Sequence, residues 1–272
     1  AKAAADDSYF LNYMGQITQP IGWFLLFLAL TAVVVLLGVE KGVEKVSKWM
    51  MPILVVLTII IAVYGLFMPG AMDGLIYYIK PDFSKFSATT VLAAMGQLFY
   101  SMSLAMGIMI TYGSYVKKEI DLNKSVNHIE IFDTSVAFLA GFMIVPAVYV
   151  FSGEAGLKTG GAGLMFETLP KVFEKMPLGR MIGLVFFVLV LLAALTSSIS
   201  LMEAIASMFM DKFKITRKKA VVIIFAVSVV LGIPSALGYG VLGNVTPLGM
   251  DFLTFFDYVS NSVLMPIVAI AT

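Results

Sequence analysis

An interrupted membrane span is the feature that most constrains this chain. Residues 91–116 read VLAAMGQLFYSMSLAMGIMITYGSYV, which is long and apolar enough to cross a bilayer. The middle of this stretch holds Gly96, Gln97, Ser101, Ser103 and Gly107. Glycine weakens a helix by roughly 1 kcal/mol relative to alanine, and unpaired backbone groups are tolerated in a membrane only where protein or a water-filled cavity satisfies them. We therefore predict a helix that breaks near the bilayer midplane and forms a candidate ligand site.

The composition excludes several classes of protein. The chain has 272 residues, of which 60% are hydrophobic and 13% charged, unlike an ordinary soluble domain or a disordered chain. A net charge of +1 gives no reason to expect a nucleic-acid partner. The chain has no cysteine and a single histidine, His128, which excludes thiol catalysis and Cys/His zinc sites. We interpret His128 as a solvated loop residue.

Apolar runs predict an all-α integral membrane protein. A spanning helix needs about 20 mostly apolar residues, and such stretches occur at 21–38, 49–68, 92–116, 132–151, 182–209, 220–237 and 252–271. Lysine and arginine gather in three connections of these spans, which places those connections in the cytoplasm. The amino end then starts outside, and the chain opens without a methionine and stops in an apolar run. We expect it to be part of a longer protein with earlier spans.

The segment 152–181 is too long for a turn. It contains five glycines followed by an amphipathic run from Leu164 to Phe173, which Pro170 is expected to stop. Segments of this length are often lids or gates. A solvated connector is an equally good interpretation from the composition alone.

Three groups of polar residues in the spans are candidate ion or ligand sites. Ala193, Thr196 and Ser197 are spaced i, i+3, i+4 and share a helix face. Their oxygens suit a hard cation, although serine and threonine also bond back to their own helix. Asp133 stands just inside an apolar run, where it either neutralises a cation or, like Glu130, is an acid in the first helical turn.

Glu203 lies inside the span 182–209. It either bonds to exposed backbone of the broken span or faces an aqueous cytoplasmic vestibule. The residues Tyr100, Ser101, Ser103 and Met106 cluster at the break, where their mixture suits a small amphiphile with an apolar tail. In most helices such a set would be ordinary packing.

Other function classes fit less well. A retinal protein needs a lysine in its last span, and residues 252–272 contain none. An intramembrane protease needs paired acids or a serine with a base, and no catalytic motif surrounds Asp133 or Glu203. We therefore expect no enzyme, and a seven-helix receptor or channel subunit remains the alternative.

The chain resembles the neurotransmitter:sodium symporter family along nearly its whole length. The resemblance rests on GVEKGVEKVSKWMMP, MGQLFYSMSLAMGIMITYGSYV, ALTSSISLMEA, FETLP and MDF. It implies a leucine-transporter-type inverted-repeat bundle, here partial, with about seven spans and one of them broken. Residues 1–68 would end the first repeat as helices four and five. Residues 69–272 would form helices six to ten, with 152–181 as an extracellular gate loop.

The resemblance also implies site residues. Sodium site 1 would include Ser101 and Asp133, and sodium site 2 the Ala193 carbonyl, Thr196 and Ser197. Substrate-binding residues would be Tyr100, Ser101, Ser103, Met106, Ser197 and Leu201, and gating residues would be Gln97, Tyr115, Asp211 and Asp251.

The resemblance implies a symporter that works by alternating access in a bacterial inner membrane. Two sodium ions would be its cofactors, and its partners would be an amino-acid substrate, membrane lipid and the missing N-terminal helices. Met106 stands where phenylalanine is common, so we expect a pocket for hydrophobic or aromatic amino acids. Asp133 stands where relatives often have asparagine, so we expect coupling that does not require chloride.

Overall fold

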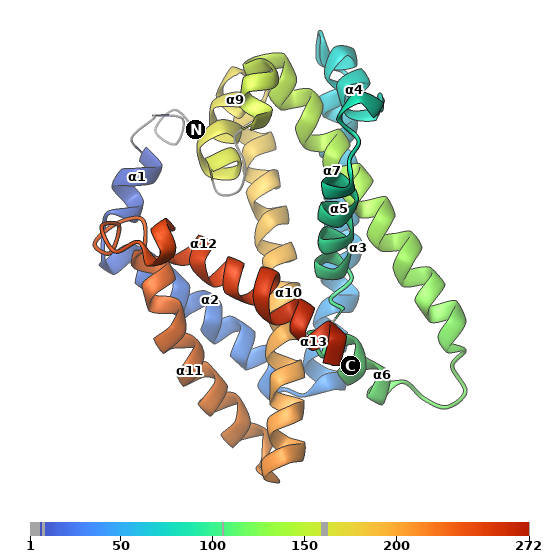
Figure 1. Cartoon of the computed structure of the whole chain (residues 1–272), viewed down its shortest axis with the longest axis vertical. Coiled ribbons are helices and arrows are strands. Elements are labelled where there is room, and N and C mark those ends of the chain that lie inside the picture. The colour runs from blue at the N-terminus through green and yellow to red at the C-terminus, as the bar shows by residue number, and fades with distance from the viewer. Residues whose placement is uncertain (1–5, 7–8, 105, 159–162, 272) are drawn as a thin grey trace. The chain divides into compact units, whose positions relative to one another are not determined.

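The computed structural model describes residue 6 and residues 9–104, 106–158 and 163–271, and all regular structure in this part of the chain is helical. The elements are α1 (Tyr9–Met14), α2 (Thr18–Leu36), the π-helix η2 (Val39–Glu44), α3 (Lys45–Leu66), α4 (Ala71–Ile79), η3 (Phe83–Lys85), α5 (Ala88–Ser101), α6 (Ile108–Tyr115), α7 (Leu122–Lys158), the π-helix η4 (Leu164–Thr168), α9 (Leu169–Lys175), α10 (Gly179–Phe213), α11 (Arg217–Leu237), η5 (Pro247–Gly249), α12 (Phe252–Asp257), the π-helix η6 (Tyr258–Leu264) and α13 (Met265–Ala271) (Figure 1).

The predicted spans are confirmed as helices. Within the described residues, 6 helices are long and apolar enough to cross a membrane. They correspond to α2, α3, α7, α10, α11 and the run from α12 to α13. The remaining predicted span, 92–116, is divided between α5 and α6. The prediction of one broken helix is therefore confirmed, although Gly96 lies inside α5 and does not interrupt it.

The helices form two compact units, of which the first comprises 1–10, 50–95 and 122–193. Its core joins α3, α4, α7, α9 and the first half of α10. In this unit α4 packs against α7 (Figure 1). A Cβ on Gly74 would lie 2.8 Å from the Cα atom of Pro146, so only glycine permits this approach.

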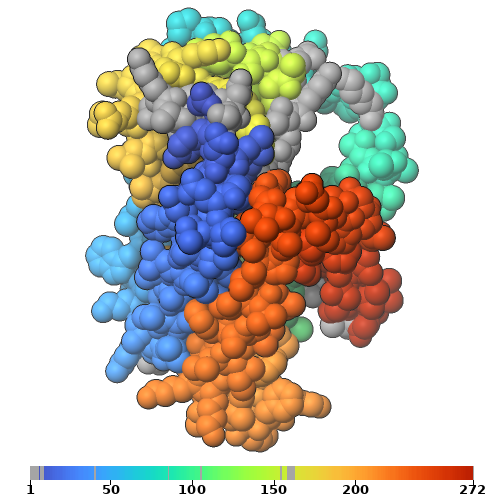
Figure 2. Space-filling view, turned by 90° about the vertical axis from the view of Figure 1, so that its left-hand side faces the viewer, coloured from blue at the N-terminus to red at the C-terminus, as the bar shows by residue number. Residues whose placement is uncertain are grey.

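The second unit comprises 11–49, 96–121 and 194–272. Its core is formed by α2, the second half of α10 and α11, with Val35, Ile199 and Ala220 fully buried. Figure 2 shows α2 and α11 side by side, in agreement with their direct packing. Both units contain residues from each side of position 68, so the division into two repeats stays a prediction.

The described residues that follow position 162 in the segment 152–181 are mostly helical and partly buried, which corrects the interpretation as a solvated connector. Residues 159–162 of this segment lie outside the described part, and the residues after them form η4 and α9. Pro170 stands in the first turn of α9, where its missing N–H costs nothing, so it begins a helix and does not stop one. Phe173 of α9 is buried against Phe186 of α10, with ring centroids 5.2 Å apart. The expected role as a gate stays a prediction.

Candidate functional site

The break in the predicted span 92–116 has a defined, hydrogen-bonded backbone conformation. α5 ends in a Schellman motif, in which Leu104 N–H donates to the Phe99 carbonyl at 2.9 Å and Ser103 N–H donates to the Tyr100 carbonyl at 3.1 Å. Ser103 has φ of 56°, the left-handed conformation in which glycine is usual. Gly107, with φ of 75°, then begins α6. The chain thus leaves one helix and enters another within a few residues, and the amides of the first turn of α6 are left for a ligand, water or protein.

Four of the six predicted substrate residues lie at this break, and the other two, Ser197 and Leu201, lie on α10. Tyr100 and Ser101 are the last residues of α5, and Ser103 and Met106 lie in the interruption. Tyr100 is 50% exposed, whereas Ser103 and Met106 are half-buried. Gln97 lies one turn before Ser101 on the exposed surface of α5.

The residues predicted for sodium site 2 lie on α10. Ala193, Thr196 and Ser197 fall within about one turn, as the spacing predicted. Thr196 is buried, whereas Ser197 is exposed together with Leu201 one turn later. Two neighbouring serines bond to their own helix, since Ser198 donates to the Leu195 carbonyl at 3.0 Å and Ser200 to the Thr196 carbonyl at 3.1 Å. The Ser197 hydroxyl faces away from the protein interior, where it can meet a ligand. Ion binding by Thr196 and Ser197 stays a prediction.

Glu203 is fully buried, with 0% of its surface exposed. Arg217, at the start of α11, donates to both carboxylate oxygens at 2.5 and 3.0 Å. Tyr115 of α6 donates to Oε1 at 2.8 Å, and Arg217 also donates to the carbonyl of Val35 at 3.2 Å. In the described part of the chain Glu203 bonds to the side chains of Tyr115 and Arg217 and has no exposed surface, so both sequence-based interpretations, a bond to the backbone of the break and an aqueous vestibule, are wrong.

We call Tyr115, Glu203 and Arg217 the ion-pair cluster. It joins the ends of α2, α6 and α11 to α10 on the side that the lysine and arginine pattern assigns to the cytoplasm. Of the predicted gating residues, Tyr115 belongs to the cluster, whereas Asp211 is exposed two turns further along α10. Arg217 was missed because it stands among five cations, although its place at the first position of a membrane helix was a usable signal.

Asp251 caps α12. Its carboxylate accepts hydrogen bonds from the Thr254 amide at 3.0 Å and the Thr254 hydroxyl at 2.6 Å. Burial acts to raise the pKa of Asp251, but the hydrogen bonds from Thr254 and the Leu253 amide outweigh it, and the pKa lies below its usual value. Burial and the charge of Asp251 both raise the pKa of Tyr239. The structure thus assigns Asp251 a capping contact, and its role as a gate stays a prediction.

Asp133 lies about three turns inside α7, which begins at Leu122. The alternative of a first-turn acid stabilised by the helix dipole is therefore wrong for Asp133 and for Glu130. Asp133 belongs to the first unit and Ser101 to the second, so their meeting at sodium site 1 stays a prediction.

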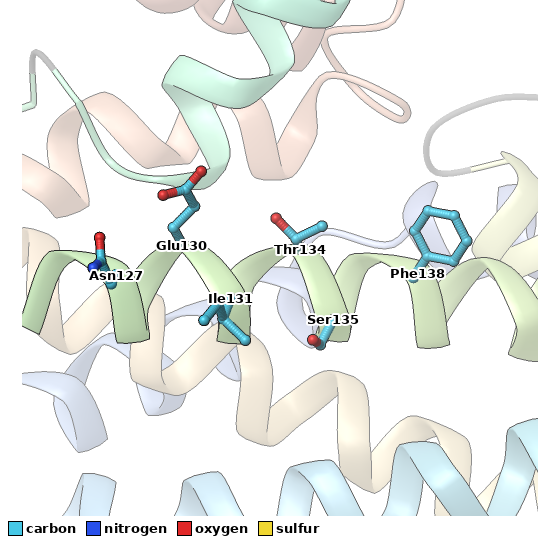
Figure 3. Close-up of a pocket in the computed structure, with 6 residues that line it drawn as sticks. All are labelled: Asn127, Glu130, Ile131, Thr134, Ser135 and Phe138. Atoms are coloured by element: carbon cyan, nitrogen blue, oxygen red, sulfur yellow. The ribbon is translucent and has the colours of Figure 1, made fainter. Parts of the chain in front are cut away.

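An open hollow of about 570 Å³ follows one side of α7. Figure 3 shows Glu130, Thr134 and Phe138 pointing to the same side of this helix, with Asn127, Ile131 and Ser135 as the other lining residues. None of the predicted site residues lines it.

Comparison with known proteins decides the family. The family model described as "Sodium:neurotransmitter symporter family" matches residues 8–272. The chain belongs to this symporter family. An "Uncharacterized sodium-dependent transporter" of Haemophilus influenzae is 34% identical over 99% of this chain and 58% of its own length. A sodium-dependent transporter of Bacillus subtilis is 36% identical over 94% of this chain and 56% of its own length.

A solved structure confirms the fold of this symporter-family chain. The crystal structure of MhsT in complex with L-phenylalanine matches with a TM-score of 0.86 and 39% identity, over 96% of this chain and 59% of that one. "Sodium- and chloride-dependent creatine transporter 1" of Bos taurus is more distant, at 27% identity over 91% of this chain and 40% of its own length. These relatives are transporters and not enzymes, and the chain is a multi-pass membrane protein. It spans a little more than half the length of the bacterial relatives.

Proposed function

We propose that this chain provides the site-bearing half of a sodium-coupled amino-acid symporter that works by alternating access. The observation that supports this most directly is the interruption between α5 and α6, which opens helix ends inside a membrane span of a sodium symporter-family protein. The chain covers 58% of the length of a bacterial relative, and we propose N-terminal helices of the same transporter as its partners in transport. Lipid covers the exposed apolar faces of the helices.

Two sodium ions are the proposed cofactors. Ala193, Thr196 and Ser197 supply a carbonyl and two hydroxyls within one turn of α10, and sodium, as a hard cation, prefers such oxygen ligands. Ser101, at the end of α5, and Asp133, on α7, supply a hydroxyl and a carboxylate for the other ion. Asp133 is an ionisable residue within a membrane helix, and such residues are rare and are candidates for ion sites.

The proposed substrate is a hydrophobic or aromatic L-amino acid. Tyr100, Ser101, Ser103 and Met106 at the break, with Ser197 and Leu201 on α10, combine apolar surface with hydroxyls, as small-molecule sites do. MhsT, which resembles this chain over 96% of its length, was crystallised with L-phenylalanine. Methionine adapts its shape more readily than phenylalanine and therefore suits a roomy pocket.

The proposed gates lie on either side of this site. The ion-pair cluster would hold the cytoplasmic side closed, because its bonds must break before α6 can separate from α10 and α11. Asp211 would contribute from the exposed surface of α10, and Gln97 and Asp251 would act on the outer side. The helices η4 and α9 would form the extracellular gate of the segment 152–181.

Removal of the hydroxyls on α10 tests the proposal. In the complete transporter, Thr196→Val together with Ser197→Ala should weaken sodium-dependent binding of tritiated L-phenylalanine at least tenfold, because two ligands of the ion are lost. The control is Thr58→Val, which removes a buried hydroxyl that bonds only to the Leu54 carbonyl of its own helix. Undiminished sodium dependence in the double variant would remove the sodium site from α10.

A further inference from the structure

The sodium-site stretch of α10, residues 196–200, is held from two sides inside the second unit. Ser198 shares a hydrogen bond of 2.8 Å with Thr31 of α2. Ser200 accepts a hydrogen bond of 2.7 Å from the hydroxyl of Tyr112, on α6. Residues two apart in an α-helix point in nearly opposite directions, since each residue advances the helix by about 100°. The stretch thus lies between two hydrogen bonds to different helices.

The bond to Tyr112 continues into the sodium-site stretch itself. The Ser200 hydroxyl donates its single proton to the Thr196 carbonyl at 3.1 Å, so it meets Tyr112 only as an acceptor. The result is a chain of donors from Tyr112 through Ser200 to Thr196. Successive hydrogen bonds of this kind polarise and strengthen one another in a low-dielectric interior.

Tyr112 also connects this series of hydrogen bonds to the interrupted span. It lies on α6, which begins at Ile108, directly after Gly107, and ends at Tyr115. Any rotation of α6 that follows binding at the break must either carry Ser200 with it or break the bond. Tyr115 makes the comparable contact to Glu203 at the far end of α6, whereas the Tyr112 hydroxyl bonds to Ser200, within the stretch 196–200.

We propose that Tyr112 is a positioning residue that couples the half-helix α6 to sodium binding on α10 through Ser200. The inference rests on the proposed function, because it assumes that Thr196 and Ser197 bind sodium. Tyr112 itself does not touch the ion. It fixes the turn of α10 that presents the ligands, so sodium binds more tightly when α6 is seated against α10.

Sodium-dependent melting of the complete transporter in detergent tests the inference without knowledge of the substrate. Melting temperatures are measured as NaCl replaces choline chloride at constant ionic strength, because a bound ion stabilises the folded state. Tyr112→Phe and Ser200→Ala should each raise the half-saturating sodium concentration about threefold to tenfold, the range expected for one interhelical hydrogen bond in a membrane. The double variant should show no further rise, since both changes remove the same bond.

Controls separate this coupling from a general loss of stability. Ser200→Thr keeps the hydroxyl, so its half-saturating sodium concentration should equal that of the wild type. Tyr77→Phe, at a tyrosine of α4 whose ring packs on Tyr149, should leave the midpoint unchanged. Two results would overturn this inference and leave the proposed function intact. The first is a double variant whose shift in sodium midpoint equals the sum of the two single shifts. The second is a wild-type sodium midpoint in both Tyr112→Phe and Ser200→Ala, with a raised midpoint in Ser197→Ala. A wild-type protein whose melting ignores sodium would overturn the proposed function and the inference with it.

Discussion

A fully buried carboxylate in a membrane helix must be compensated, and Glu203 has two partners for this purpose. Arg217 donates hydrogen bonds to both carboxylate oxygens, and Tyr115 donates to one of them. The Arg217 guanidinium also donates to the Val35 carbonyl in the last turn of α2. The side chain of Arg217 is only 23% exposed, so neither charge is screened well by water. Removal of Glu203 or Arg217 alone should therefore destabilise the protein more than removal of both, because a single removal leaves the other charge uncompensated.

Removal of one partner should be strongly destabilising. We expect Glu203→Ala to lower the free energy of unfolding by about 3–5 kcal/mol, because it leaves the Arg217 guanidinium uncompensated. The variant in which Glu203→Ala and Arg217→Ala are combined should recover part of this loss. The measurement is the fraction that remains monodisperse after heating in detergent. A double variant as unstable as the sum of the two single ones would show that the pair has no coupling energy.

The cluster also shows why residue-level prediction failed for Glu203. Its acidic character and its place within an apolar span were visible in the sequence, but its partners were not. Arg217 follows Glu203 by fourteen residues, across the turn that ends α10, and Tyr115 precedes Glu203 by 88 residues. Pairs of this kind depend on helix packing, which hydropathy does not report.

At the scale of the element, the interruption is set by Ser103 together with Gly107, and not by Gly96. Gly96 continues α5 as a helical residue, and Ser103 takes the left-handed conformation that ends it. A non-glycine residue in this conformation costs roughly 1–2 kcal/mol. Such strain is usually kept at functional sites, which agrees with the proposed contact between Ser103 and the substrate.

Substitution of Ser103 should separate conformation from chemistry. Ser103→Gly relieves the backbone strain, so we expect a melting temperature equal to or above that of the wild type. It also removes the hydroxyl, so L-phenylalanine binding should weaken about threefold to tenfold, as for the loss of one hydrogen bond. Ser103→Val, which is β-branched and has no hydroxyl, should lose both stability and binding. Full binding by Ser103→Gly would show that the serine serves the turn alone.

The connections were harder to predict than the spans. α7 begins at Leu122, ten residues before the apolar run. The residues LNKSVNHIEI form a polar part of this helix, which a hydropathy window does not detect. The same error made Asp133 a first-turn acid. The prediction that Pro170 stops a helix is wrong because proline is equally suited to a first helical turn. The apolar spans themselves were predictable because bilayer thickness fixes their length and the backbone must be satisfied internally.

At the scale of the whole molecule, the proposed role of Asp133 predicts how the transporter responds to chloride. Bacterial relatives are named sodium-dependent, whereas the creatine transporters are named sodium- and chloride-dependent. A fixed carboxylate at the proposed sodium site 1 would supply the negative charge that chloride supplies elsewhere. In low-dielectric surroundings a cation without such a partner is strongly disfavoured. The wild-type transporter should therefore bind L-phenylalanine equally well in sodium chloride and in sodium gluconate.

Neutralisation of this charge should create a need for chloride. We expect Asp133→Asn to bind L-phenylalanine poorly in sodium gluconate and at least fivefold better when chloride replaces gluconate, because the anion restores the missing charge. The matched control is Glu130→Gln, which removes an acid from the same helix, at the hollow in Figure 3, and should leave binding independent of chloride. If Asp133→Asn kept its sodium coupling and remained indifferent to chloride, the negative charge beside the ion would have to come from another residue or from the substrate carboxylate.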